Sequence, residues 1–357
     1  MANGSLLERM LDWIYSAYGA AFGPLRLLDS FFFLAGTGFA FAALVTWILL
    51  PRLWHLLPVD RGRAHAVNAE LSLGKPLSTG VIFVGVFAVS AVLFLPLDSV
   101  ALRTVPLILV ATVVGYFDDR VGGFSEVKLA AMDAVISLLA AFLIVGLAPA
   151  VIWLPIWRDP LILPVWLAIP LWAGVIWVAI NATNCSDGVD GVSGSLTGTA
   201  IIILGGLLYT VIGDRAVAEH LHIPANPEGA SWAIMAFLMT GAVGGYLWYN
   251  AAPSQALMGD AGSRPLGLLI GLLVAATGNP LFLLMVGLVI VLNGATGWVK
   301  VAMIRFFRIR VLQNIRFPLH DHARKELGWS NTQVLVRFML LHLGLSALIV
   351  TLVLKVR

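Results

Sequence analysis

Long apolar stretches, each about the length of a membrane-spanning helix, alternate with short polar connections along most of the chain. A helix needs roughly 20 apolar residues to cross the hydrocarbon core of a bilayer, which is about 30 Å thick. Apolar runs bounded by charged residues and by Pro or Gly predict ten such helices. They cover residues 31–50, 79–97, 101–117, 128–149, 163–181, 192–212, 229–249, 264–278, 280–304 and 333–354. The predicted fold class is therefore an all-α, polytopic integral membrane protein.

Composition supports this prediction and excludes a water-soluble enzyme. Of the 357 residues, 60% are hydrophobic and only 11% are charged, and the mean hydropathy of +0.94 exceeds what a soluble domain of this length carries. We expect one membrane-embedded domain over residues 1–357. Within it, residues 1–25 are expected to form a short interfacial segment, because Glu8, Arg9 and Asp12 stand among apolar residues.

Basic residues report the orientation of the chain rather than a nucleic-acid partner. The net charge of +3 comes from 22 basic and 19 acidic residues that are dispersed between apolar runs, so no basic patch forms. Cytoplasmic loops of membrane proteins are enriched in Lys and Arg. The connections after the odd-numbered helices hold Arg52, Arg61, Arg63, Lys75, Arg120, Lys128, Arg264, Arg305, Arg308, Arg310, Arg316, Arg324 and Lys325. We therefore expect these connections in the cytoplasm and both termini on the opposite side.

The acidic residues are clustered in the same connections. This side carries Asp118, Asp119, Asp187, Asp190, Asp260, His320, Asp321 and His322. The connections on the other side show no comparable clusters, so the pattern predicts a single polar active-site cleft at the cytoplasmic face. The alternative is that these loops are simply polar.

Two clusters have the composition of a metal or phosphate site. The sequence GYFDD at 115–119 ends a predicted helix in Asp118 and Asp119, two carboxylates that repel unless a cation or proton intervenes. The sequence MGDAGS at 258–263 contains Asp260, a hard oxygen ligand suited to Mg²⁺, between glycines that let the backbone approach a phosphate. A solvated helix end is the alternative for the first cluster.

The sequence NATNCSDGVDG at 181–191 places Asn181, Asn184, Asp187 and Asp190 three residues apart. Each step of three turns an ideal helix back by about 60°, so a continuous helix would scatter these side chains over opposite faces. The glycines in the run allow a break that lets the polar groups converge. A loop of ordinary turn residues is the alternative.

The sequence PLHDHARKELGW at 318–329 brings His320 and His322 to either side of Asp321. Imidazoles could bind phosphate oxygens, relay protons or ligate a metal. An ionised Asp321 favours the protonated forms of its neighbours, so we expect positive charge on His320 at neutral pH.

The order of these motifs over residues 110–340 of a ten-helix protein resembles the polyprenyl-phosphate N-acetylhexosamine-1-phosphate transferases. The sequence GW followed by VLVRF, after the histidine motif, is similar to the branch of phospho-N-acetylmuramoyl-pentapeptide transferases. The loop KPLSTG at 75–80 stands where that branch has a Lys-Gly-Thr-Pro loop.

The resemblance implies roles for individual residues. Asp260 would coordinate Mg²⁺, Asp118 and Asp119 would lie beside it with one acting as base toward the lipid phosphate, and His320 would join this catalytic group. The implied substrate-binding set is Lys75, Lys128, Asn181, Asn184, Asp187, Asp190, Asn250, Leu257, Ser263 and His322. The chain departs from the family pattern at Arg120, which no Lys follows closely, at Leu257, which replaces an aromatic residue, and at Asp321, which replaces a His.

The resemblance also implies a reaction and its partners. Phospho-MurNAc-pentapeptide would pass from UDP-MurNAc-pentapeptide to undecaprenyl phosphate, a membrane lipid, giving lipid I and UMP in the bacterial cytoplasmic membrane. A homodimer is left open. Two alternatives remain: transfer of GlcNAc-1-phosphate for another surface polymer, and an ion-coupled transporter. Transporters place ionisable groups near the bilayer midplane, whereas Asp133, Lys300 and Arg337 lie within about two turns of the predicted helix ends.

Overall fold

The computed structural model describes residues 5–7, 9, 27, 30–62, 72–310 and 312–355. Most of the predicted interfacial segment, residues 1–25, lies outside the described residues. The elements in chain order are α2 (Phe31–Leu53), η2 (Trp54–Leu56), α3 (Gly80–Phe94), α4 (Val100–Val121), α5 (Glu126–Val145), β1 (Ala150–Ile152), β2 (Leu161–Leu163), α6 (Val165–Cys185), α7 (Val192–Leu207), η4 (Leu208–Ile212), α8 (Arg215–His220), α9 (Gly229–Asn250), α10 (Asp260–Ala276), α11 (Phe282–Gly294), α12 (Thr296–Phe307), α13 (Leu319–Lys325) and α14 (Asn331–Lys355).

Each of the ten predicted apolar segments is helical in the structure. Among the described residues, seven helices are long and apolar enough to cross a membrane, or eight if the bent pair of α11 and α12 counts as one. Helices α3 and α10 have 15 and 17 residues, so they are only about 22 and 26 Å long at 1.5 Å per residue. The prediction of a mostly helical, polytopic membrane protein is confirmed, with fewer full-length helices than predicted.

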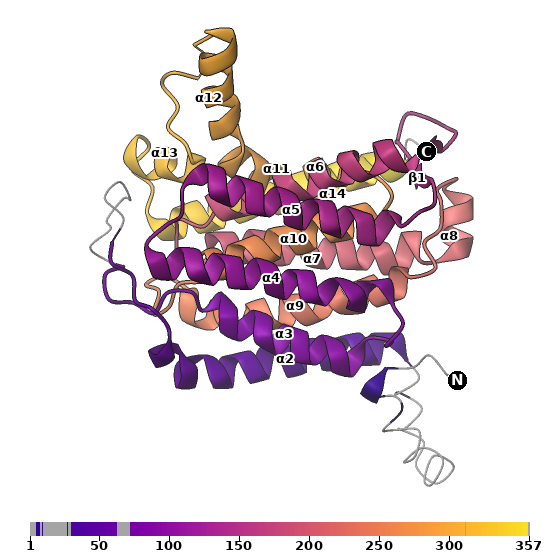
Figure 1. Cartoon of the computed structure of the whole chain (residues 1–357), viewed down its shortest axis with the longest axis horizontal. Coiled ribbons are helices and arrows are strands. Elements are labelled where there is room, and N and C mark those ends of the chain that lie inside the picture. Colours follow the sequence, from indigo (N-terminus) through magenta and orange to yellow (C-terminus); the bar gives the residue numbers. More distant parts are fainter. Residues whose placement is uncertain are drawn as a thin grey trace.

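The segment 280–304, predicted as one span, is broken into α11 and α12, which meet at an angle of 56°. The hydroxyl of Thr296 donates to the carbonyl of Leu292 one turn back, and bonding of this kind bends helices. Gly294 holds the end of α11 against α6, since a Cβ there would lie 2.4 Å from the Ala182 carbonyl oxygen. Helix α12 then leaves the bundle, as Figure 1 shows.

A small antiparallel hairpin departs from the all-α prediction. Strand β1 pairs with β2 so that Ala150 faces Leu163. Each strand has three residues, which is too short for an apolar and polar alternation to show in the sequence.

Helix α10 occupies the centre of the bundle (Figure 1). Every residue of α10 is buried, and the helix contacts α3, α4, α5, α6 and α7. Gly267 permits the close approach to α6, because a Cβ at this position would lie 2.5 Å from the Ile180 Cα. Since α10 begins at Asp260, the MGDAGS sequence sits in the middle of one end of the bundle.

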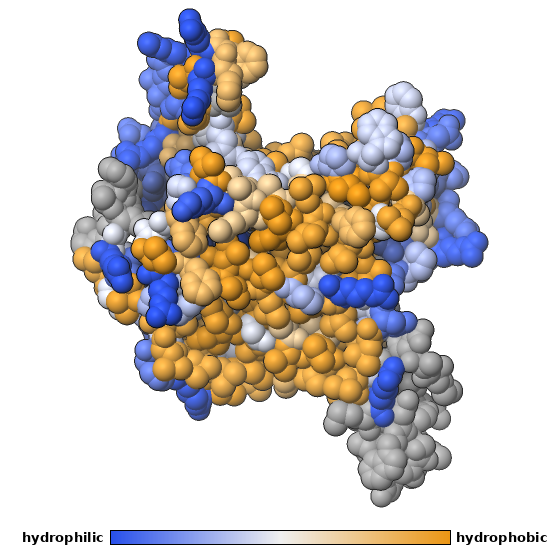
Figure 2. All heavy atoms as spheres, in the orientation of Figure 1, coloured by the Kyte–Doolittle hydropathy of each residue, from blue (hydrophilic) through white to orange (hydrophobic). Residues whose placement is uncertain are grey.

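The two ends of the bundle differ from its sides. Figure 2 shows a mainly apolar surface between the ends, with hydrophilic residues gathered toward the left and right of the view. Large apolar side chains such as Val113, Leu139 and Phe142 are exposed on these sides, as expected of a lipid-facing surface. The candidate site lies at the end with α13, and β1, α8 and the end of α14 lie at the other (Figure 1). Which end faces the cytoplasm stays a prediction.

Candidate active site

Three aspartates from two helices form a carboxylate cluster. Asp118 and Asp119 lie in the last turn of α4, Asp260 begins α10, and one oxygen from each lies within 4.8 Å of the others. Gly115 makes this possible, because a Cβ there would lie 2.2 Å from the Asp260 carbonyl oxygen. Asp118 and Asp260 are each 7% exposed. The structure thus brings the GYFDD and MGDAGS sequences together.

Asp119 accepts hydrogen bonds at the start of α10. Its Oδ1 accepts from the backbone amide of Asp260 at 3.1 Å, and its Oδ2 accepts from the Ala261 amide at 3.3 Å and from the Ser78 hydroxyl at 2.7 Å. The first amides of a helix have no partner within the helix and carry positive partial charge. Asp119 therefore caps α10 from another element. Asp118 makes a different bond, accepting from the Phe124 amide.

A buried arginine, Arg264, which the sequence pattern places only in a loop, contacts the cluster. Arg264 donates from Nε and Nη2 to Asp260 Oδ2 at 3.0 and 2.9 Å and from Nη1 to Asp133 Oδ2 at 2.5 Å. Arg264 is 3% exposed and Asp133 1%. The sequence did contain one indication of this ion pair. Asp133 is a carboxylate inside an apolar helix, and a buried carboxylate needs a partner.

The polar run at 181–191 begins in α6 and continues into the connection to α7, so the predicted helix break is present. Asn184 donates to the Ser263 hydroxyl at 2.9 Å, which joins α6 to α10. Asn181 donates to the Trp177 carbonyl at 3.0 Å and also hydrogen-bonds Asp133. Asp187 and Asp190 lie after the end of α6, and they line a cavity.

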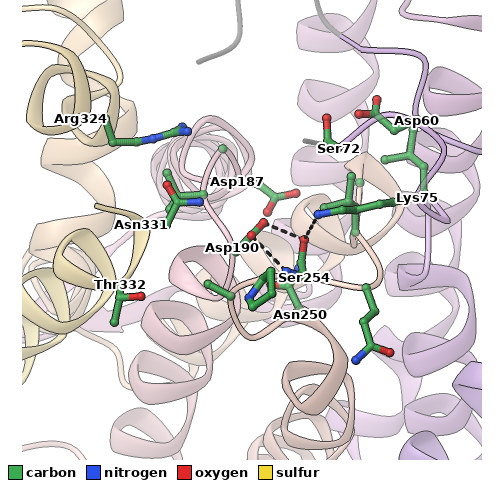
Figure 3. Close-up of a pocket in the computed structure, with 18 of the residues that line it drawn as sticks. Asp60, Ser72, Lys75, Asp187, Asp190, Asn250, Ser254, Arg324, Asn331 and Thr332 are labelled. Carbon is green, nitrogen blue, oxygen red and sulfur yellow. Dashed lines mark hydrogen bonds between the residues drawn. The ribbon is translucent and has the colours of Figure 1, made fainter. Parts of the chain in front are cut away.

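Asp187 and Asp190 line a cavity of about 800 Å³, shown in Figure 3. Its wall includes a hydrogen-bond chain in which the Lys75 ammonium donates to the Ser254 hydroxyl at 2.9 Å and Ser254 donates to Asp190 Oδ1 at 2.8 Å. The Ser254 amide also donates to Asp190 Oδ2 at 3.2 Å. The KPLSTG loop, which starts at Lys75, thus lies beside the polar run.

Gly259 connects the cavity wall to the carboxylate cluster. This glycine lines the cavity, has a φ of +63°, and carries a hydrogen where a Cβ would lie 2.2 Å from Asp119 Oδ2. Leu257 also lines the cavity, and its carbonyl accepts from the Thr79 amide at 3.1 Å. Only glycine fits this approach of the 251–259 loop to Asp119.

Asn250 lines the cavity, but the structure uses both ends of its amide. Its Oδ1 accepts from the Gly191 amide at 2.8 Å and its Nδ2 donates to the Ala256 carbonyl at 2.8 Å. Asn250 is 5% exposed. Asn250 therefore connects the polar run at 181–191 to the 251–259 loop.

His320 is buried and neutral, which corrects the expectation of a protonated imidazole. Its amide and its Nδ1 lie 2.9 and 3.1 Å from Asn293 Oδ1, so Nδ1 carries the proton. Burial lowers the pKa of His320 to about 4, although Asp321 acts in the opposite direction. Desolvation of the charged form outweighs one carboxylate, whose nearest oxygen is 3.9 Å from Nε2.

Five predicted substrate-binding residues do not line the cavity: Asn181, Asn184 and Ser263, which lie in α6 and α10, and Lys128 and His322. Among the described residues that line it, neither Lys128 nor His322 is present. Lys128 is exposed in the first turn of α5, and His322 Nδ1 accepts from the Arg316 amide at 3.4 Å.

Several residues of the cavity wall were not among the predicted site residues. They include Asp60, Ser72, Ser254, Arg324, Asn331 and Thr332. Arg324 lies 3.8 Å from Asp321, and its position one turn beyond the histidine motif was the available signal. The polar residues of 330–332 precede the last apolar segment and could not be distinguished from an ordinary loop.

Comparison with known proteins gives the family. Residues 101–278 match the model of glycosyl transferase family 4. The chain is 42% identical over 324 residues to the phospho-N-acetylmuramoyl-pentapeptide-transferase of Treponema pallidum (strain Nichols), covering 90% of this chain and 89% of the relative. Proteins of the same name from Nautilia profundicola (28% identical; 81% and 84% covered) and Bartonella quintana (27% identical; 85% and 88% covered) are also similar. The chain therefore belongs to the phospho-N-acetylmuramoyl-pentapeptide-transferase family.

Proposed function

We propose that the chain transfers phospho-MurNAc-pentapeptide from UDP-MurNAc-pentapeptide to undecaprenyl phosphate, producing lipid I and UMP for peptidoglycan synthesis. The observation that carries this proposal is the position of the carboxylate cluster, Asp118, Asp119 and Asp260, directly beside Gly259 in the wall of the cavity. The apolar sides of the bundle would contact the lipid bilayer, in which the prenyl chain of undecaprenyl phosphate lies. Family membership excludes the transporter alternative.

The donor set of the cluster fits Mg²⁺. Carboxylate oxygens are the ligands that this cation prefers, and those of Asp118, Asp119 and Asp260 lie close enough to share one ion. When bound, Mg²⁺ would neutralise charge on the diphosphate and on the leaving UMP. Because both Asp119 oxygens already accept hydrogen bonds at the start of α10, Asp118 is the better candidate for the base toward the lipid phosphate.

The cavity wall supplies groups for the nucleotide substrate. Lys75 and Arg324 bring positive charge toward a diphosphate, and Leu257 offers an apolar surface. Asp187 and Asp190 are acceptors for hydroxyl or imide donors of the uridine. His320, as a neutral imidazole behind Gly188, supports this wall rather than contributing charge to it.

A product assay tests the proposal. The purified protein, in lipid nanodiscs with undecaprenyl phosphate and MgCl₂, receives either UDP-MurNAc-pentapeptide or UDP-GlcNAc. We expect UMP release and a lipid product of the mass of lipid I with the first nucleotide only. Turnover with UDP-GlcNAc alone would contradict the proposal and favour the GlcNAc-1-phosphate transferase alternative.

We further propose that the site faces the cytoplasm, in accord with the distribution of Lys and Arg. The test uses Lys325→Cys, near the site, and Glu219→Cys, at the other end, each in a Cys185→Ala background. A membrane-impermeant maleimide added to intact cells should label the Glu219→Cys protein and should label the Lys325→Cys protein only after permeabilisation. The reverse pattern would invert the topology.

A further inference from the structure

The carboxylate cluster is connected to a fourth carboxylate through Arg264. Both Nε and Nη2 of Arg264 donate to one oxygen of Asp260, Oδ2, and Nη1 donates to Asp133 on α5. The three side chains are buried at the level of the bundle where α5, α6 and α10 meet. A buried guanidinium that donates to two carboxylates has a fixed orientation, because its N–H donors form a rigid, planar arrangement.

We propose that Arg264 and Asp133 are positioning residues that set the orientation and the charge of Asp260 for the divalent cation. The inference rests on the proposed function, in which Asp260 is a Mg²⁺ ligand. It adds two residues to the machinery of the site, neither of which touches substrate.

The geometric part of the argument concerns the Asp260 carboxylate. Arg264 follows Asp260 by one helical turn, so the backbone of α10 presents both groups on one face. Two hydrogen bonds to the same oxygen restrict rotation of the carboxylate about its Cβ–Cγ bond. They hold it in the orientation in which the cluster with Asp118 and Asp119 forms.

The electrostatic part concerns Asp133. A guanidinium that faced Asp260 alone would cancel one negative charge of the cluster and would oppose binding of a dication. Asp133 offsets that charge, so the cluster keeps the net charge of its three carboxylates while Asp260 keeps its two hydrogen bonds. Asn181, the other polar neighbour that hydrogen-bonds Asp133, is uncharged and leaves this balance unchanged.

The test separates charge from hydrogen bonding. Asp133→Asn retains an oxygen acceptor for Arg264 but removes one negative charge. We expect the dissociation constant for MgCl₂, measured by calorimetry on the purified full-length protein, to rise about tenfold. The double variant Asp133→Asn/Arg264→Gln removes both charges of the pair, keeps an amide donor toward Asp260, and should return to within about threefold of the wild type.

A purely structural role for the pair predicts a different result. Loss of packing would lower the unfolding temperature of both variants without moving the Mg²⁺ constant of Asp133→Asn. Asp98→Asn, an exposed carboxylate before α4 at the opposite end, is the matched control and should change neither quantity. Wild-type affinity in Asp133→Asn, or no recovery in the double variant, would overturn the inference.

Asp260→Asn distinguishes this inference from the proposed function. If Asp260→Asn abolishes Mg²⁺ binding while Asp133→Asn leaves it unchanged, only the positioning role fails. If Asp260→Asn binds Mg²⁺ like the wild type, the metal assignment fails, and the positioning role fails with it.

Discussion

Gly188 lies directly against the imidazole of His320. A Cβ atom on this glycine would be 2.3 Å from His320 Nε2, so the imidazole packs directly against the backbone of Gly188. Gly188 lines the cavity and belongs to the polar run at 181–191, whereas His320 belongs to the motif before the last helix. The contact therefore joins two motifs that are far apart in the sequence and places the histidine behind the cavity wall.

Gly188→Ala should displace His320 or the loop that holds Asp187 and Asp190. A contact this short cannot be relieved by a flexible side chain, because the ring is buried and bound to Asn293. We expect UMP release to fall at least about tenfold, with a loss of stability of about 1–3 kcal/mol from overpacking. Gly206→Ala is the control, since a Cβ there meets nothing within 4 Å. Equal activities of the two variants would contradict the contact.

The stability of the protein should decrease in mild acid because of His320. Its pKa is about 4 in the folded protein and 6.5 ordinarily, so between these values the unfolded chain binds more protons than the folded chain. The contribution of His320 to the free energy of unfolding is therefore complete above pH 6.5, and it decreases by up to about 3 kcal/mol as the pH falls toward 4.

Thermal unfolding between pH 7.5 and 5 measures this dependence. His320→Gln should have a flatter profile than the wild type, whereas His220→Gln, which changes an exposed histidine of α8, should keep the wild-type profile. A profile of His320→Gln that is as steep as the wild-type profile would assign the titration to another group.

Lys75 and Lys128 were both predicted to bind substrate, and the structure separates them. Lys75 lines the cavity and donates to Ser254, whereas Lys128 is exposed outside the described lining. Lys75→Met should raise the KM for the UDP-sugar about tenfold or more, as expected for the loss of a charge-assisted contact. Lys128→Met should change KM less than about twofold. The opposite ranking would show that the substrate extends toward α5.

Leu257→Phe should tighten binding of the uridine nucleotide. Leu257 lines the cavity, and an aromatic side chain there could stack on a base. Such a contact contributes roughly 0.5–1.5 kcal/mol beyond area burial, or about two- to twelvefold in affinity. Calorimetry with UDP-MurNAc-pentapeptide is the measurement, and Leu340→Phe, on an exposed position of α14, is the control. Unchanged or weaker binding would place the base elsewhere.

The sequence by itself determined the class of the protein and the composition of its site. The apolar segments must be helical, because a bilayer offers no partner for unpaired backbone groups, and every predicted segment is helical, although 280–304 is divided into α11 and α12. The aspartates of the GYFDD, NATNCSDGVDG and MGDAGS sequences could be identified because carboxylates next to apolar helices are costly to bury and therefore informative. The distribution of Lys and Arg predicted one common side for them, and the structure places them at one end.

Only the tertiary structure decided what each polar side chain does. Burial removes water from His320 and leaves it neutral, which no count of neighbouring charges in the sequence could show. The hydrogen bonds of Asp119 to the start of α10, of Asn250 to Gly191 and of Arg264 to Asp133 all join segments distant in the chain. Partners of this kind depend on how the helices pack, and close packing depends on contacts such as that of Gly115 with Asp260, which local sequence patterns do not contain.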